Sequence, residues 1–322
     1  MRRKALLAAV TGFIGWSAVT PLAAQNYPVK PIRFIIPFPP GGGTDLFGRL
    51  LAQKISEAWG HQVIVDSRPG AQGSLGTAQA ARAEPDGYTL LLAQTGPFTI
   101  NPFIYKNVGY DPIKDFNAVS LGTDQPYLVV VHPSVPARTL KELAMLAKTQ
   151  PGKMSYASSS SIAQLVGELF KLVTRSDILH IPYKGAGGAT FDLLAGNVDL
   201  MFSTPTASIP HVVARKLRAL AITSTSRDPN LPDIPTSKES GFPEFEATGW
   251  YGISVPASTP RYIILSLNAE ISRVLSLPDV KVRLARGGLN ASSSSPEHFA
   301  ELIKRDYDRW GKVVKSIGMS AD

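Results

Sequence analysis

The 322-residue sequence contains no cysteine. This absence excludes disulfide bonds, thiolate catalysis and cysteine metal sites, and it suits an oxidising compartment such as a bacterial periplasm. Charged residues are also sparse, at 18% against 44% hydrophobic residues. That balance is typical of a globular protein with a buried core, and the length favours two domains of medium size over one.

No apolar run reaches the ~20 residues that a membrane span needs. The N-terminus instead joins the basic residues 2–4 to a short apolar run, 5–20, and then to the small residues Ala23 and Ala24. This order predicts a secretory signal peptide over residues 1–24, with an uncleaved anchor as the alternative. The formal net charge of +8 is scattered along the chain, so no basic stripe indicates nucleic-acid binding.

Histidine is scarce, and its spacing matters more than its number. The five histidines are His61, His132, His180, His211 and His298. No two are four residues apart and none lies in an H-E-x-x-H motif, so the pattern predicts no metal site. The stretch AQGSLG (71–76) lacks the first glycine of a nucleophile elbow and fits a turn before a helix better. We therefore expect no catalytic residues and no enzymatic activity.

Apolar runs alternate with amphipathic stretches along the chain, in the strand–loop–helix–strand order of a parallel α/β protein. The first unit has predicted strands at 31–38 and 87–97 and a predicted helix at 44–60 with Thr44 as its N-cap. Between them, 62–83 predicts a strand, a glycine-rich turn and a helix. The second has predicted strands at 127–133, 153–161, 178–185, 199–204 and 217–225, and helices at 139–152, 162–176, 186–197 and 207–217. A proline-rich loop (228–246), a strand (250–256) and two helices (260–276 and 296–318) follow. We expect the second unit to be inserted into the first.

Two prolines and three glycines separate a predicted strand from a predicted helix in PFPPGGGTD (37–45). The stretch lacks the Lys-Ser/Thr pair of a P-loop and the spacing of G-x-G-x-x-G. A glycine loop at a helix N-terminus presents free N–H groups and a partial positive charge to an anion. The residues therefore leave two interpretations open, an anion site and a simple tight turn.

The stretch SYASSSSIAQL (155–165) repeats this geometry in the second unit, with serine hydroxyls in addition to N–H groups. An ordinary N-cap cluster is the alternative. Together the two loops suggest a ligand clamped between the units, with each unit contributing one helix N-terminus. Aromatic residues near the predicted strand ends either line a cleft or pack in the core; they are Phe38, Phe98, Tyr183, Phe202 and Trp250.

Several long stretches resemble one known family over essentially the whole chain after the signal peptide. They include YPVKPIRFIIPFPPGGGTD, VDSRPGAQGSLGT, PDGYTLL, YDPIKDF, IPYKG, LRALAITSTSRDPNLPDIPTSKESGFPEFE and GWYGISVPASTP. The sequence is similar to the Bug-type receptors, the extracytoplasmic solute-binding proteins of tripartite tricarboxylate transporters. The resemblance implies an α/β, two-lobed periplasmic binding protein fold of the type II class, with a ligand cleft between the lobes and no cofactor. We expect one lobe to comprise 25–126 and 250–322, and the other 127–249.

The resemblance also implies a set of ligand-binding residues. The first family loop corresponds to Phe38, Pro40, Gly41, Gly42, Gly43 and Asp45, whose main-chain groups would hold a carboxylate. The second corresponds to Ser158, Ser159, Ser160 and Ser161. The ends of further predicted strands add Thr95, Tyr183, Phe202, Ser203 and Thr204. Here the second loop is two residues shorter than the family pattern, lacks glycine and has Gln164 where a histidine is usual, so the resemblance names no single ligand.

The expected function is that of a periplasmic receptor that captures a small organic carboxylate and delivers it to a membrane permease. The family's ligands include aliphatic carboxylates, amino acids and aromatic acids. We expect a monomer that acts by hinge closure. Two alternatives stay open, a periplasmic sensor that signals to a membrane kinase and a periplasmic serine hydrolase.

Overall fold

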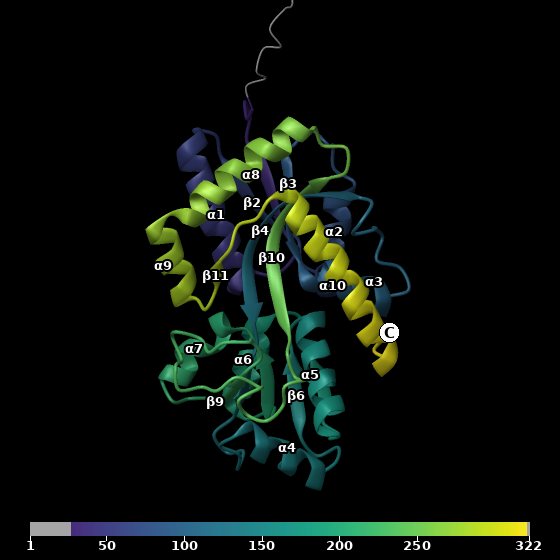
Figure 1. Cartoon of the computed structure of the whole chain (residues 1–322), viewed down its shortest axis with the longest axis vertical. Helices are drawn as coiled ribbons and strands as arrows, with labels where there is room; N and C mark the ends of the chain where they lie inside the picture. Colours follow the sequence, from purple (N-terminus) through teal and green to yellow (C-terminus); the bar gives the residue numbers. More distant parts are fainter. Residues whose placement is uncertain (1–26, 321–322) are drawn as a thin grey trace, which may run out of the picture.

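The computed structural model describes residues 27–320, so the predicted signal peptide over 1–24 lies outside the described residues. The chain forms two lobes, one above the other in Figure 1, each built around its own sheet. The predicted two-lobed α/β fold is confirmed in this respect, and the second sheet is made from a segment inserted between strands of the first.

The first lobe contains a six-stranded mixed sheet. Its spatial order is β11 (Asn290–Ala291), β4 (Phe116–Pro126), β10 (Thr248–Pro256), β3 (Thr89–Gln94), β1 (Ile32–Ile36) and β2 (Val63–Ser67). Its helices are α1 (Gly43–Trp59), α2 (Ser74–Ala81), α3 (Asn101–Ile104), α8 (Arg261–Ser276), α9 (Pro278–Arg286) and α10 (Pro296–Ile317), with short helical turns η1 (Ala71–Gly73) and η2 (Gly96–Ile100).

The second lobe contains a five-stranded sheet. Its spatial order is β7 (Leu179–Pro182), β6 (Ser155–Ser158), β8 (Leu200–Ser203), β5 (Leu128–Val131) and β9 (Arg218–Ile222). The helices of this lobe are α4 (Leu140–Thr149), α5 (Ser161–Thr174), α6 (Ala186–Ala195) and α7 (Pro205–Val213). Because β6 lies parallel to both β7 and β8, the loops that leave these three strands emerge at the same edge of the sheet, toward the first lobe.

The start of α1 differs from the prediction. Thr44 lies inside the helix, and the N-cap is Gly42, whose carbonyl accepts hydrogen bonds from the N–H groups of Asp45 and Leu46 at 3.1 Å each. No side chain caps this end. Its first N–H groups are therefore available to a ligand, because a capping side chain would otherwise satisfy one of them.

The long strand β4 is the main element that the sequence pattern missed. Its residues do not alternate strictly between buried and exposed positions, so no two-residue period is visible. It pairs antiparallel with β10, from Phe116 opposite Pro256 to Pro126 opposite Thr248, with two bulges. The predicted parallel rhythm is therefore wrong for this part of the sheet, since antiparallel pairing between strands so distant in sequence leaves no local periodic signal.

The chain passes from the first sheet to the second between β4 and β5, and it returns at the start of β10. Thr223, just after β9, connects the two passages. Its hydroxyl accepts a hydrogen bond from the N–H of Tyr127 at 2.9 Å and donates one to the carbonyl of Ala247 at 2.6 Å. The two segments that join the lobes are therefore held side by side.

The lobes also share apolar packing on one flank. The largest group of buried apolar side chains lies mainly in the second lobe, but it also includes Ile100, Ile104, Trp310, Val314 and Met319. α10 begins on the first sheet, and its last turns extend down beside α5 (Figure 1). Helix α10 thus contacts both lobes, although the prediction assigned 250–322 wholly to the first.

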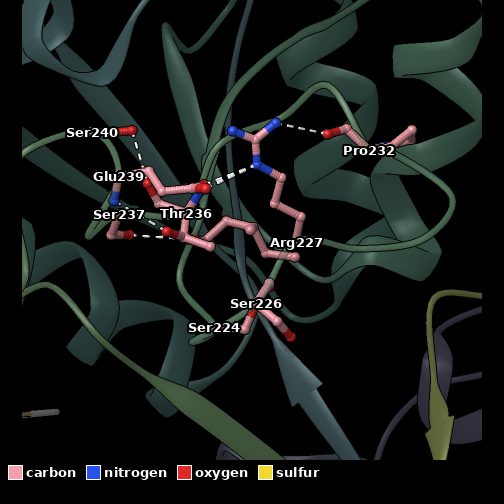
Figure 2. Close-up of polar contacts among 9 residues, drawn as sticks. Ser224, Ser226, Arg227, Pro232, Thr236, Ser237, Glu239 and Ser240 are labelled. Carbon is pink, nitrogen blue, oxygen red and sulfur yellow. Dashed lines mark hydrogen bonds and ion pairs between the residues drawn. The ribbon is translucent and has the colours of Figure 1, made fainter.

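The proline-rich segment 228–246 has no helix or strand, as predicted, and polar contacts hold it in place (Figure 2). The guanidinium of Arg227 donates hydrogen bonds to the carboxylate of Glu239 at 2.9 Å and to the carbonyl of Pro232 at 2.9 Å. Glu239 also accepts from the N–H of Thr236 at 2.7 Å. A single carboxylate thus joins the start of this loop to its middle.

Candidate functional site

A cavity of about 470 Å³ lies between the lobes, within the size range of small-ligand sites. From the first lobe it is lined by Phe38, Pro39, Pro40, Gly42, Gly43, Thr44, Gln94, Gln125 and Tyr251. From the second lobe and the connecting segment it is lined by Tyr127, Ser159, Ser160, residues 183–188 and Thr204. The loop 37–45 and the serine loop, chosen from sequence, thus face the same space.

Four helices begin at this cavity. The N-cap residues are Gly42 for α1, Ser160 for α5, Gly185 for α6 and Thr204 for α7, and all four line it. A helix N-terminus carries unpaired N–H groups and a partial positive charge. Their convergence makes the cavity electrostatically favourable for an anion without a cluster of basic side chains.

Formal charge is scarce in the cavity wall. Lys184 is the one basic side chain among the described residues that line it, and no aspartate or glutamate of the described chain does so. A ligand carboxylate would therefore meet no like charge in the described wall. Asp45, which was chosen from sequence, is not part of this lining; it pairs with Arg49 at 2.6 Å and accepts the N–H of Gly41 at 3.2 Å.

The glycines of the first loop have different surroundings. Gly43 packs closely, since an added Cβ would lie 3.1 Å from both Thr206 Oγ1 and Tyr251 Oη. An added Cβ at Gly42 would meet only Thr44 Oγ1, at 3.9 Å. Gly41 has φ +92° and does not line the cavity, so its conformation shapes the loop.

The four serines divide into two pairs. Ser159 and Ser160 line the cavity, and the Ser160 hydroxyl accepts the N–H of Ala163 at 3.3 Å as the α5 cap. Ser158 and Ser161 lie behind them and are buried. The Ser161 hydroxyl has no hydrogen-bond partner among the described residues.

A serine and a histidine do come together in the second lobe. Ser158 Oγ lies 2.7 Å from His180 Nε2, a contact that the sequence did not predict. Burial lowers the pKa of His180, the Glu168 carboxylate opposes this and Lys171 adds to it. Ser158 is only 3% exposed and lies outside the cavity wall, so the pair has no access to a substrate there.

Other residues chosen from sequence lie away from the cavity. Thr95 accepts the N–H of Trp250 at 2.8 Å through its hydroxyl. Phe202 is fully buried in the core, and Ser203 accepts a hydrogen bond from the Ser208 hydroxyl. Gln164 is buried in α5 and is likewise outside the lining. Of the five aromatic candidates, Phe38 and Tyr183 line the cavity, whereas Phe98, Phe202 and Trp250 are buried core residues.

The sequence interpretation missed two buried amides. Gln94 ends β3 and Gln125 is the penultimate residue of β4; both line the cavity and are less than 10% exposed. Neither Nε2 atom has a hydrogen-bond partner in the described part of the chain. Such groups are costly unless paired. Both lie at the ends of strands, β3 and β4, that are separated only by β10 in the sheet, and strand ends are where ligands commonly bind.

Three tyrosines add hydroxyl groups. Burial raises the pKa of Tyr127 and of Tyr251 well above the usual value, although the nearby amide of Gln125 partly offsets this for Tyr251. Burial and a 2.5 Å hydrogen bond to Asp192 raise the pKa of Tyr183 to about 12. All three stay protonated near neutral pH. The hydroxyls of Tyr127 and Tyr251 can donate hydrogen bonds to a ligand, whereas the Tyr183 hydroxyl already donates to Asp192.

Between residues 27 and 320, no helix is both long and apolar enough to cross a membrane. In the same range, no three histidine, aspartate or glutamate side chains are grouped as metal ligands would be.

Two sheets with an inserted second lobe and a cavity at the interface define a two-lobed solute-binding fold. The family model of the tripartite tricarboxylate transporter family receptor matches residues 47–319, and the chain belongs to that family. The chain is 36% identical to protein BugT of Bordetella pertussis, over 99% of each sequence.

Solved structures are similar over nearly the same length. The periplasmic binding protein BugD matches with a TM-score of 0.86 and 34% identity, covering 91% of this chain and 99% of that one. A protein of R. palustris solved with adipate matches with a TM-score of 0.88 and 32% identity, covering 92% and 99%. The family predicted from sequence is thus confirmed, as is its class, that of solute-binding receptors.

Proposed function

We propose that this protein is a periplasmic receptor that holds a small organic carboxylate between its lobes and delivers it to the membrane permease of a tripartite transporter. The observation that carries the proposal is the convergence of four helix N-termini on one cavity whose described lining contains no carboxylate. The related R. palustris protein solved with adipate supports the ligand class.

The binding contacts follow from the lining groups. The N–H groups at Gly42 and Gly43 donate hydrogen bonds to the ligand carboxylate, and Ser159 and Ser160 face it from the second lobe. Gln94 and Gln125 donate from the first, through amide groups that lack other partners. Each hydrogen bond to a charged group contributes ~1.5–3 kcal/mol, so a handful suffices for the ~8 kcal/mol of a micromolar complex.

Closure of the cleft is a rotation about the passages between β4 and β5 and before β10. In this proposal the moving units are the described parts of 25–126 with 250–322, and 127–249, and α10 contacts both of them. The ligand stabilises the closed form because it contacts both lobes. No reaction step is needed, so the receptor acts without turnover; we propose that it does so as a monomer.

The first experiment is a thermal-shift screen of the chain from residue 25 against aliphatic di- and tricarboxylates, acidic amino acids and aromatic acids. A ligand that binds only the folded state raises the unfolding midpoint, and the shift grows with the logarithm of the ligand concentration above its Kd. Gly42→Leu is the matched test, because its side chain enters open space at the cavity wall. We expect at least ~100-fold weaker binding, as steric exclusion removes the main-chain hydrogen bonds.

Ala214→Leu, at an exposed position outside the cavity, is the control and is expected to bind normally. Unchanged affinity in Gly42→Leu would show that the ligand does not use this loop. A flat response across the whole panel would reject the carboxylate itself. Capture of permease subunits, as opposed to a membrane kinase, distinguishes the transport role from that of a sensor.

A further inference from the structure

A second cavity, of about 800 Å³, adjoins the first on the outer side of the 37–45 loop. Phe38, Pro39, Ser159, Tyr183 and Lys184 line both cavities. The two spaces therefore adjoin each other at Phe38 and Tyr183.

The outer cavity has a different chemistry. Its own walls include Pro37, Pro69, Ala71, Tyr105 and Pro182, so prolines and an aromatic ring make up much of the surface. One helix, α2, begins there at its N-cap Gly73, and Lys184 is the one basic side chain in the described lining, which contains no acidic residue. The apolar part of this surface gains from burying apolar or aromatic groups.

The turn that forms the far wall is strained and firmly held. Four consecutive residues, Gly70 to Gly73, have positive φ angles, including Ala71 at 44° and Gln72 at 51°. The side-chain amide of Asn101 donates to the carbonyl of Gln72 at 3.1 Å, and an added Cβ at Gly73 would lie 2.8 Å from Phe38 Cε2. Non-glycine residues in this conformation carry a cost and tend to occur at functional sites, and this turn fixes the position of Phe38 between the two cavities.

We infer that the outer cavity is a second subsite, which receives the apolar or aromatic body of a ligand whose carboxylate sits in the inner cavity. This rests on the proposed function. The preferred ligands are accordingly monocarboxylates with an aryl or extended apolar group, in preference to short aliphatic dicarboxylates. Phe38 and Tyr183 are the aromatic surfaces at the junction.

The test compares two probes by titration calorimetry, 4-phenylbutanoate and succinate. We expect 4-phenylbutanoate to bind at least ~10-fold more tightly, because burying a phenyl group contributes a few kcal/mol. Ala71→Phe fills the outer cavity and is expected to remove that advantage without weakening succinate. Tyr105→Ala removes an aromatic side chain from the wall of the outer cavity and is also expected to reduce the advantage of 4-phenylbutanoate. It serves as the test variant if Ala71→Phe fails to fold.

Ala214→Phe, outside both cavities, is the control, and circular dichroism checks folding. Tighter binding of succinate, or a phenylbutanoate advantage that survives both variants, would overturn the second subsite and leave the proposed function intact. Failure of both probes, and of the carboxylate panel, would reject the proposed function and the subsite together.

Discussion

The buried, unpaired amide nitrogen of Gln94 destabilises the ligand-free protein, and this indicates that Gln94 binds the ligand. It is 7% exposed, it lines the inner cavity, and its amide nitrogen has no partner in the described chain. A buried group left without a hydrogen bond costs ~1–3 kcal/mol. A ligand acceptor in the cavity gives this nitrogen a partner, so we expect Gln94 to contribute more to the complex than to the free protein.

Gln94→Met, which keeps the shape and removes the amide, should therefore separate stability from affinity. We expect the free protein to be more stable by ~1 kcal/mol, and the ligand to bind ~10- to 150-fold more weakly, because one charge-assisted hydrogen bond is lost. Urea unfolding and titration calorimetry measure the two effects. Gln79→Met, at an exposed position on α2, is the matched control, and normal affinity in Gln94→Met would exclude a ligand contact.

The sequence pattern selected Thr95 as a ligand-binding residue, whereas the adjacent Gln94 lines the cavity. The pattern correctly placed a strand ending in polar residues at 87–97, but β3 ends at Gln94. Successive residues of a strand point to opposite faces. A prediction that is wrong by one position therefore selects a side chain that points into the core and not into the cavity. Thr95 accordingly serves the backbone of Trp250, and Gln94 faces the cavity.

At the scale of elements, α10 couples the lobes through its last turns. Trp310 is 1% exposed and belongs to the core shared with the second lobe, whereas Phe299 packs near the first sheet. Trp310→Ala should destabilise the protein by ~3–5 kcal/mol, the range for a fully buried tryptophan. Because the lost packing joins both lobes, the unfolding transition should also become broader.

Trp59→Ala is the comparison, since Trp59 is only partly buried at the end of α1 and a smaller loss is expected. Calorimetric unfolding distinguishes the two variants. Equal losses in both would show that the α10 contact contributes nothing beyond ordinary burial.

Most elements of this fold were predictable, because helices such as α1 and α5 carry an amphipathic period and glycine or serine starts. The exceptions have physical causes. β4 is stabilised by its partner β10, more than a hundred residues later in the chain, so nothing local marks it. Gln125, near the end of β4, was missed for the same reason, although the 37–45 loop and the serine loop, which line the same cavity, were predicted.

At the scale of the whole molecule, the two lobes approach closely across the cleft. An added Cβ at Gly185 would lie 2.9 Å from Pro39 Cγ, and Gly185 has an extended φ of 176° that any residue adopts. A proline Cγ is one bond from its Cβ, so the two positions suit a disulfide. The chain has no cysteine of its own, so no other thiol competes.

The double variant Pro39→Cys, Gly185→Cys should oxidise to a cross-linked form that locks the cleft. Ligand present during oxidation should then dissociate at least ~10-fold more slowly, because release needs the cleft to open. Dialysis of a labelled ligand measures this, with the reduced double variant and each single variant as controls. Unchanged release from the cross-linked form would show that the ligand leaves without separation of the lobes.

The insertion of the second lobe into the first has a consequence for the order of assembly. β10 lies between β3 and β4 in the first sheet, yet it follows every strand of the second sheet in the chain. A chain that emerges N-terminus first therefore completes β5 to β9 while the first sheet still has a gap at its centre. The second lobe can fold early, and the first waits for the returning strand, with its edges at β3 and β4 open to a chaperone until then.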